Sequence, residues 1–331
     1  MIVVTLTARM QRHLYIKTGI ISIAGIFLLF LPQIIPGSNY FLQILTTCFL
    51  YATLALSWNL LAYSGKISLG HAAFFGVGAY GSSLVALNFD INPLLSIWCG
   101  GCFAAILACT GGFLFSRLKG AYFALTTLAL VEIPKMIIEN WETLTRGSLG
   151  LLNIPPLRIA STIAQSYLPT YFINLGVLML VFLFLTLIFS SRWGWAINAL
   201  RQDEKVSFSL GINATFYHVT TMTVSGFIAG VCGAIYAHSV GIIEPSMVFS
   251  IHYSALPMVM SLFGGRSTIV GPIVGAFILF SIDQLAFQAI LPIGHQILYG
   301  LAIMVTILYM PDGIMGLANR EHLWHYSRQK K

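Results

Sequence analysis

The stretch "YSGKISLGHAAFFGVGAYGSS", residues 63–83, is the first place in this sequence where phosphate chemistry could occur. A phosphate-binding loop needs Gly, four residues, and then Gly-Lys-Ser/Thr, so that backbone amides hold the phosphates. Gly65 and Lys66 supply the Gly-Lys pair, but Leu60 stands at the first glycine and Ile67 at the hydroxyl position. No other Gly-Lys pair occurs. We therefore predict that this chain hydrolyses no nucleotide and holds no cofactor.

Cys99 and Cys102 have the C-x-x-C spacing of a metal or redox pair. No second cysteine or histidine cluster completes such a site, and all five cysteines lie in apolar runs. We therefore interpret them as small apolar helix residues. Since there is also no catalytic triad and no pair of carboxylates, the sequence predicts no catalytic and no metal-binding residue, and a membrane enzyme is the weakest alternative.

His71 and Asp283 are ionisable residues inside apolar runs, where such residues are functional candidates by default. His71 lies about one turn into the run 67–88, and we favour a structural hydrogen bond for it over a substrate contact. Asp283 lies about 25 Å along a helix from Arg266, at 1.5 Å per residue, towards the opposite end. Ion-coupled carriers usually have polar groups near the membrane centre. Their scarcity here indicates that the energy for transport comes from elsewhere.

Glu132, Lys135 and Glu139 follow one another at helical spacing, which permits ion pairs along one helix face. They also fall near the end of a predicted span rather than near its centre. We interpret them as an ion-pair stripe.

The composition is that of a membrane protein, because 57% of the residues are apolar and only 8% are charged. Soluble domains have about 25% charged residues. A spanning helix needs about 20 mostly apolar residues. Runs of this kind predict an all-α polytopic bundle of about ten spans: 18–35, 41–62, 67–88, 93–115, 120–139, 171–190, 216–239, 250–264, 267–290 and 295–310. The run 250–264 is short and contains Pro257, so a re-entrant or broken segment is an alternative there.

The basic residues predict the orientation, because Lys and Arg are enriched in cytoplasmic loops. With both termini inside, fourteen of the seventeen basic residues are cytoplasmic, and only Lys135, Arg146 and Arg158 are outside. The net charge of +7 is therefore a topology signal first and an anionic-lipid contact second, and it does not indicate nucleic acid. The N-terminal run lacks a small-x-small cleavage site and is interpreted as a retained helix.

Two longer polar segments interrupt the spans, at about 140–170 outside and about 191–215 inside. The other connections are short turns, and no separate soluble domain is expected. Residues 1–331 are therefore predicted to form one transmembrane domain. The inner segment mixes charged and apolar residues and is predicted to be an amphipathic helix. From these residues alone, the helix suits the bilayer surface and a groove on a partner equally well.

Glycines concentrate in three spans, where small residues allow helices to approach closely. The predicted residues for packing, with lining of a transport path as a possible added role, are Gly70, His71, Gly76, Gly78, Gly226, Gly230, Gly271 and Gly275. A weak internal repeat accompanies them, because Gly65 with Lys66 and Gly265 with Arg266 each precede a glycine-rich span. Parallel repeats of this kind are common in transporters.

Several stretches together carry a resemblance that covers nearly the whole chain in order. They are "SGKISLGHAAFFGVGAYGSS", "ALRQDEKVSFSLGINATFYHV", "SGFIAGVCGAIYAHSVGIIEPSMV", "SLFGGRSTIVGPIVGAFIL" and "LYGLAIMVTILYMPDGIMGL". In these stretches the chain resembles the permease subunits of branched-chain amino acid ABC importers, the LivH/LivM family, and within it the LivM branch.

The resemblance implies a division of labour in a bacterial inner membrane. It implies a second, related permease, two cytoplasmic ATPase subunits that use ATP and Mg²⁺, and a periplasmic binding protein that delivers the amino acid. It implies ATPase coupling through Ala199, Leu200, Arg201, Asp203, Glu204, Leu210 and Gly211. The outer segment is similar to the family's extracellular loop, and its candidate docking residues for the binding protein are Arg146, Gly147 and Gly150.

One departure and two alternatives accompany this resemblance. The family usually has Gln where this chain has Lys66, and we expect Lys66 to extend its charge to the membrane edge without a family role. Related permeases move urea, short amides or other amino acids, so the substrate is a separate question. A self-contained secondary carrier or channel is the alternative of another class, and it predicts transport without an ATPase.

Overall fold

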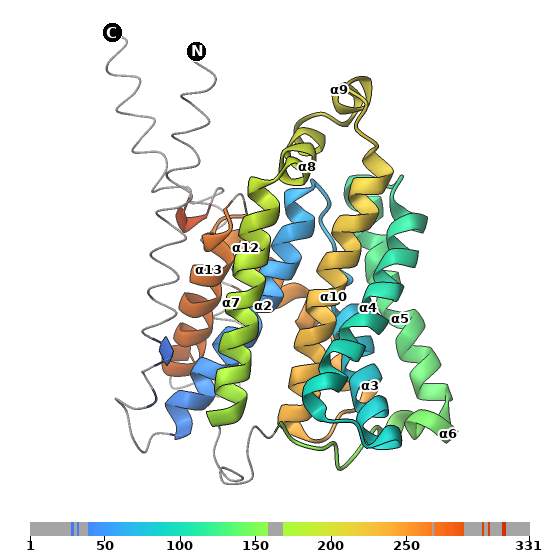
Figure 1. Ribbon diagram of the computed structural model, residues 1–331, viewed down its shortest axis with the longest axis vertical. Coiled ribbons are helices and arrows are strands. Elements are labelled where there is room, and N and C mark those ends of the chain that lie inside the picture. The colour runs from blue at the N-terminus through green and yellow to red at the C-terminus, as the bar shows by residue number, and fades with distance from the viewer. Residues whose placement is uncertain are drawn as a thin grey trace.

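The protein is an all-helical bundle in the parts of the chain that the structure describes (Figure 1). This computed structural model describes residues 39–157, 168–266 and 268–287, with a few further positions near the two ends of the chain (28, 29, 32, 300, 304 and 313–315). Seven helical segments in these ranges are long and apolar enough to cross a membrane, and Val270–Leu285 is a shorter apolar helix. The predicted spans 18–35 and 295–310 lie outside the described ranges almost entirely, so a count of ten remains a prediction.

The long helices match most of the predicted runs. They are α2 (Asn39–Tyr63), α3 (His71–Phe89), α4 (Pro93–Phe115), α5 (Gly120–Asn140), α7 (Leu168–Ser190) and α10 (Ala214–Val240). Shorter helices are α6 (Glu142–Thr145), α8 (Arg192–Gln202), α9 (Glu204–Ser209), α11 (Pro245–Val248), α12 (His252–Gly264) and α13 (Val270–Ile282). A 3-10 turn, η1 (Gly147–Leu149), follows α6, and a π-helical turn, η2 (Asp283–Phe287), follows α13.

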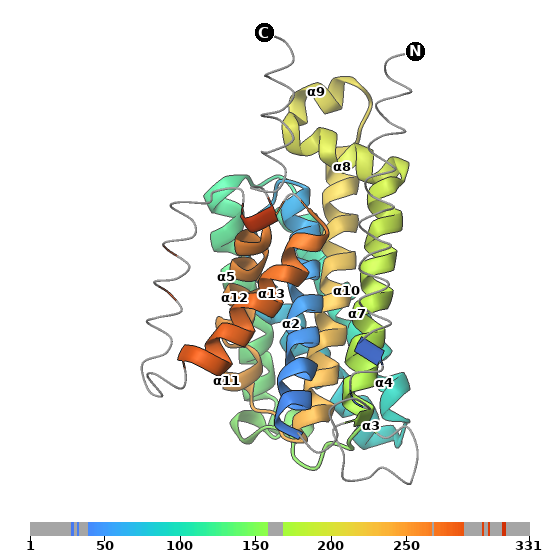
Figure 2. The same cartoon turned by 90° about the vertical axis from the view of Figure 1, so that its left-hand side faces the viewer.

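Helix α10 lies at the centre of the bundle and packs along α3 and α4. Helix α2 lies on its other side and connects it to α7, α12 and α13, as the two views agree (Figures 1 and 2). The buried sides of α3, α4 and α10 are rich in Gly, Ala and Ser, and small residues let helices in a membrane approach closely.

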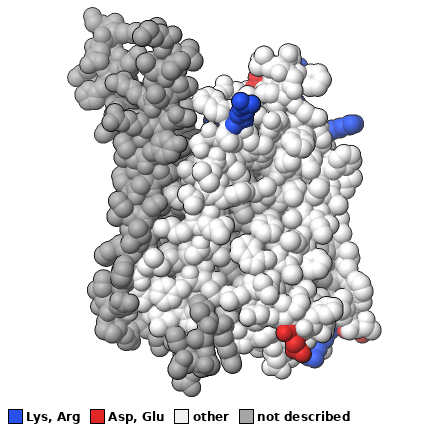
Figure 3. All heavy atoms as spheres, in the orientation of Figure 1, with Lys and Arg blue, Asp and Glu red and all other residues white. Residues whose placement is uncertain are grey.

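The bundle has two ends with different structure (Figures 1 and 2). We call one the α9 end; it comprises α8, α9 and the connections 64–70 and 116–119. We call the other the α6 end; it comprises α6, η1, the α3–α4 turn and the residues that follow α10. On the face drawn in Figure 3, the charged side chains gather towards these ends and leave the surface between them without charge. This pattern fits a protein that spans a bilayer.

Two helices differ from their predicted runs. Helix α3 begins at His71 rather than at residue 67, because residues 64–70 form turns and extended backbone. The run 250–264 is part of a broken segment, in which α11 and α12 are separated by residues 249–251 and together give a candidate span of 20 residues. The break lies at the start of the predicted run rather than at Pro257, which is inside α12. The position of the Lys66 side chain also differs from the expectation, as described below.

Candidate functional site

The non-helical stretch 64–70 enters the bundle and holds the start of α3 at depth. The Leu69 amide donates to the Thr127 hydroxyl at 3.1 Å, and the Ala72 amide donates to the Ser254 hydroxyl at 2.9 Å. Thr127 lies about 10 Å along α5 from its α9-end terminus, and Ser254 lies about 15 Å along α12 from its own. Non-helical backbone at such depth requires partners for its polar groups, which these side chains supply.

His71 is fully buried at the first position of α3. Its Nε2 lies 3.0 Å from the Ser225 hydroxyl oxygen, and that hydroxyl donates to the Ser57 carbonyl at 2.8 Å. Since the hydroxyl has one hydrogen, its oxygen accepts from His71 Nε2. The predicted structural hydrogen bond is therefore present, and it connects α3 to α10 and α2.

The glycines predicted to serve helix packing all lie where another part of the chain approaches. A Cβ atom at Gly78 would collide with the carbonyl oxygen of Gly230, so α3 and α10 touch through their backbones. Each of the other positions leaves no room for a Cβ either: Gly70 meets Thr127, Gly76 meets the Phe249 ring, Gly226 meets Ala108, Gly230 meets Ala104, Gly271 meets Gly265, and Gly275 meets Met260. The structure thus supports packing for these residues, and it leaves lining of a path as a prediction.

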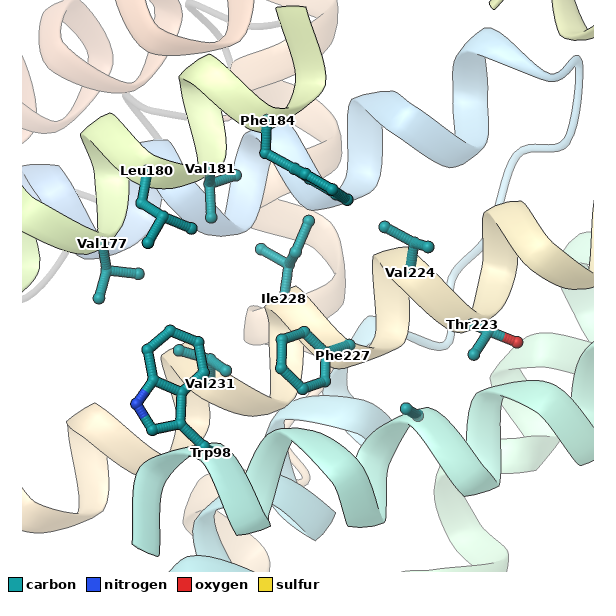
Figure 4. Close-up of a pocket in the computed structure, with 11 residues that line it drawn as sticks. Trp98, Val177, Leu180, Val181, Phe184, Thr223, Val224, Phe227, Ile228 and Val231 are labelled. Atoms are coloured by element: carbon teal, nitrogen blue, oxygen red, sulfur yellow. The ribbon is translucent and has the colours of Figure 1, made fainter. Parts of the chain in front are cut away.

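An open groove of about 310 Å³ lies on the side of the bundle between α4, α7 and α10 (Figure 4). Its lining residues are Trp98 and Ala105 of α4, Val177, Leu180, Val181 and Phe184 of α7, and Thr223, Val224, Phe227, Ile228 and Val231 of α10. Thr223 is the one lining side chain with an oxygen, and the others present carbon and the Trp98 ring. Such a surface suits hydrocarbon and offers little to a charged solute.

The predicted coupling segment is two helices rather than the single amphipathic helix expected. Helix α8 begins after Ser191, whose hydroxyl accepts from the Trp193 amide, and it ends at Gln202. Asp203 then starts α9, because its carboxylate accepts from the amides of Lys205 at 2.8 Å and Val206 at 3.1 Å. An Asp inside an expected helix is thus a cap, which explains the break.

The two halves of this segment present different faces. In α8, Ala196, Ile197 and Leu200 are buried, with Leu200 only 5% exposed, and Ala199 is half-buried. In α9, Val206 is 57% exposed, and Phe208 and, just beyond it, Leu210 are each 74% exposed. The Arg201 guanidinium lies over the Tyr63 ring at 4.9 Å, and Gly211 closes the segment at a positive φ of 82°. The α8 half is therefore packed on the bundle and the α9 half projects from it (Figure 1).

Lys66 does not extend to the membrane edge as expected. Its side chain is buried, and Nζ donates to the carbonyl oxygens of Ser116, at 3.0 Å, and Leu118. The ammonium also lies 5.2 Å from the centre of the Phe123 ring. Burial lowers the pKa of Lys66 below its ordinary value, and the nearby Glu204 carboxylate opposes part of that change. The departure from the family's usual Gln thus creates a buried charge with partners.

Glu204 forms an ion pair with Lys119, and its carboxylate lies 4.0 Å from His218 Nε2. Burial would raise the pKa of Glu204, but the hydrogen bond and charge of Lys119, with the charge of Lys66, hold the pKa below its ordinary value. Lys66, Lys119 and the stretch from Glu204 to His218, which are far apart in the sequence, therefore come together at the α9 end.

The predicted docking residues for a binding protein lie at the α6 end: Arg146 lies between α6 and η1, Gly147 begins η1, and Gly150 follows it. Arg146 is exposed in a left-handed conformation, with φ 60°. Gly147 is buried against the Glu139 carbonyl, and a Cβ at Gly150 would collide with the Ile243 carbonyl. The glycines let the segment pack down, while Arg146 is the one of the three with a side chain available to a partner. The predicted loop extends to 170, and its residues 158–167 lie outside the described ranges.

Residues 150–157 fold back over the end of α10. Leu151 and Ile243 form an antiparallel bridge, and the Ile154 amide donates to the Gly241 carbonyl at 3.0 Å. His238 adds a third attachment that the sequence analysis did not identify. Its Nδ1 donates to the Pro155 carbonyl at 2.7 Å.

The other ring nitrogen of His238, Nε2, therefore accepts, and it lies 2.8 Å from the Ser82 hydroxyl and 3.0 Å from the Ser96 hydroxyl. His238 is buried and joins residues 150–157 to α3 and α4. A polar residue near the end of an apolar run is the one signal that could have found it.

The ion-pair stripe and the cysteines have simpler roles. Lys135 lies 3.5 Å from the Glu132 carboxylate on α5. Cys99 is half-buried and Cys102 is exposed on the side of α4. Across the described residues, no group of three or more His, Cys, Asp or Glu side chains could hold a metal ion.

Comparisons with known proteins give this architecture a family. The family model for the "branched-chain amino acid transport system / permease component" matches residues 40–308. The chain is similar to the high-affinity branched-chain amino acid transport system permease protein LivM of Escherichia coli, with 27% identity over 297 residues, which cover 82% of this chain and 69% of that protein. It is 26% identical to LivH of Salmonella typhimurium over 312 residues, 88% and 96% of the two chains.

The permease protein BraD of Pseudomonas aeruginosa is a third relative, with 26% identity over 310 residues, 86% of this chain and 98% of that protein. No solved structure matches the chain. Since the family match covers most of the sequence, the resemblance stated from the sequence is confirmed. The chain, a helical membrane protein with several spans, belongs to the family of permease components of branched-chain amino acid transport systems.

Proposed function

We propose that this protein is the membrane-spanning subunit of an ABC importer for the branched-chain amino acids leucine, isoleucine and valine. ATP is hydrolysed by separate ATPase subunits, two per complex, and this chain pairs with a second, related permease. In this proposal the α9 end is cytoplasmic, both termini are cytoplasmic, and the membrane is the bacterial inner membrane. The family match and the printed names of LivM, LivH and BraD support the substrate class.

The exposed apolar side chains on and beside α9 are the main support for the proposed contact with the ATPase subunits. Val206, Phe208 and Leu210 are exposed on and beside α9, which stands clear of the long helices at one end of the bundle (Figure 1). Apolar side chains in a polar, capped helix outside the spans favour a protein groove as their partner. The capped, two-part segment gives this surface a fixed shape, because α8 is packed on the bundle beneath it.

Charged substitutions on this surface test the proposal. Phe208→Asp with Leu210→Asp should abolish copurification of the ATPase subunits and ATP-dependent uptake while the protein remains folded in the membrane. The matched control is Phe89→Asp, because Phe89 is 72% exposed at the opposite end of α3. Leu200→Asp is unsuitable, since Leu200 is buried and its substitution would disrupt packing. Unchanged copurification in the double variant would contradict the proposed ATPase surface.

Substrate delivery is proposed to occur at the α6 end. A periplasmic binding protein docks on the segment around Arg146, and the amino acid then crosses by alternating access. The attachments of residues 150–157 to α10 support this role, because they join the exposed segment firmly to the bundle. Arg146→Glu should weaken binding-protein-dependent uptake without changing ATPase copurification.

The substrate is tested by uptake of radiolabelled leucine and urea in cells with and without the gene, at matched membrane potential. Loss of leucine uptake alone supports the proposal. Loss of urea uptake alone would keep the family and change the substrate to a small amide. Leucine uptake that persists in the absence of ATPase subunits would instead indicate a self-contained carrier or channel.

A further inference from the structure

We propose that Lys119, Glu204 and Lys66 form an electrostatic joint that transmits movement of α9 to the start of α3. This inference rests on the proposed function, because it assigns a route to the coupling between ATPase and transport path. The three residues belong to the connection before α5, the start of α9 and the connection before α3. None of these segments is adjacent to another in the sequence.

The connection 116–119 is the centre of this joint, because it is held from both sides. On one side, Lys119 pairs with Glu204, the first residue of α9. On the other side, the carbonyl oxygens of Ser116 and Leu118 accept from Lys66. A displacement of α9 therefore moves the connection 116–119, and this connection moves Lys66.

Charge attaches α9 to the bundle here. The apolar side chains of Val206, Phe208 and Leu210 are mostly exposed, so they contribute little to holding α9 against the helices beneath it. The Glu204 carboxylate instead reaches Lys119 and lies 4.0 Å from His218 on α10. Lys119 is 65% exposed, so the pair adds little to stability. The pair instead holds the start of α9 in one position relative to the connection 116–119.

Movement of Lys66 reaches α3 through the stretch 64–70. This stretch is continuous with the first turn of α3, whose start is fastened to α5 and α12 by hydroxyl groups. Helix α3 in turn touches α10 through Gly78 and Gly230 without intervening side chains. Packed segments of this kind move as units, so a shift at Lys66 changes the position of the glycine-rich helix.

Charge reversal tests the joint in the complete transporter, reconstituted in vesicles with its ATPase subunits and binding protein. Lys119→Glu and Glu204→Lys alone should each lower leucine uptake per ATP hydrolysed by about fivefold or more. The double variant restores the opposite-charge pair in reverse, and it should return this ratio to near the unmodified value. A purely structural role would change thermal stability and leave the ratio of uptake to ATP hydrolysis unchanged.

Arg117→Glu is the matched control, because Arg117 lies exposed in the same connection and carries the same charge. Like Lys119→Glu, it removes one basic residue from the connection. It therefore controls for altered membrane insertion. Single variants that behave like Arg117→Glu, or a double variant that stays as uncoupled as the single ones, would overturn the joint alone. Absence of ATP-dependent leucine uptake in the unmodified transporter would overturn the proposed function, and the joint with it.

Discussion

Lys66 has a buried charge whose partners are backbone carbonyl groups at the end of α4. A long side chain without a donor leaves those carbonyl oxygens unpaired, which costs about 1–3 kcal/mol for a buried group. We therefore expect Lys66→Met to lower the free energy of unfolding by about that amount, measured by thermal unfolding in detergent. Lys66→Gln keeps an amide group that can donate, and it should lose less. Equal stability of the two variants would contradict the assignment.

Glu204 predicts how stability depends on pH at the α9 end. Its folded-state pKa is held below the ordinary value of 4.5. A carboxyl group of this kind stabilises the folded state above its ordinary pKa, and this stabilisation is lost as the pH falls through the lowered pKa. We expect Glu204→Gln to melt below the unmodified protein at pH 7, and the difference to shrink as the pH falls below about 4.5.

The matching measurement is the melting temperature of both proteins across that pH range. A difference that grows towards acid pH would contradict the ion pair.

At the level of single residues, the sequence indicates that Lys66 is unusual and that Glu204 belongs to the coupling segment. It does not indicate which residue Glu204 contacts. Glu204 lies 85 positions from Lys119 in the sequence, and no local pattern records a contact over that separation.

The close contact between α3 and α10 predicts that stability and uptake depend sharply on side-chain size at Gly78. A methyl group at Gly78 has no room beside the Gly230 carbonyl, and overpacking of this kind costs about 1–3 kcal/mol or more. Gly78→Ala should therefore lower the melting temperature and uptake together. Gly176→Ala is the control, because a Cβ there meets nothing within 4 Å. Equal melting temperatures for the two variants would contradict direct backbone contact between α3 and α10.

At the level of elements, hydropathy predicted α2, α4, α5, α7 and α10 to within a few residues, because lipid imposes long apolar runs. It placed the start of α3 too early, since Ile67 and Leu69 read as helix. The stretch remains non-helical because Thr127 and Ser254, from α5 and α12, satisfy nearby amides. Such tertiary partners override a local pattern and leave no periodic signal in it. Asp203 also misleads the prediction, because the sequence alone places it as one charge within a single helix, whereas its carboxylate caps the start of α9.

The whole molecule has a charge distribution that predicts its orientation. Lys66, Lys119, Arg192, Arg201 and Lys205 belong to the α9 end, which the positive-inside rule assigns to the cytoplasm. A membrane-impermeant thiol reagent added to intact cells with a permeable outer membrane should label Leu149→Cys and leave Ser209→Cys unlabelled. The unmodified protein gives the background from its own cysteines. The reverse labelling would invert the proposed topology.

The stretch before α3 also bears on the order of membrane assembly. When residues 64–89 leave the ribosome, Thr127 and Ser254 have not yet been synthesised, so the amides of Leu69 and Ala72 lack the hydroxyl groups that later receive them. Unpaired amides are costly in hydrocarbon, so we expect α3 to stay at a watery or protein-lined site until its partners emerge. In this expectation α3 enters the bilayer later than helices that follow it in the sequence. Truncation before residue 254 should leave it accessible to the translocation machinery, whereas α4 or α7 can enter the bilayer as soon as each is made.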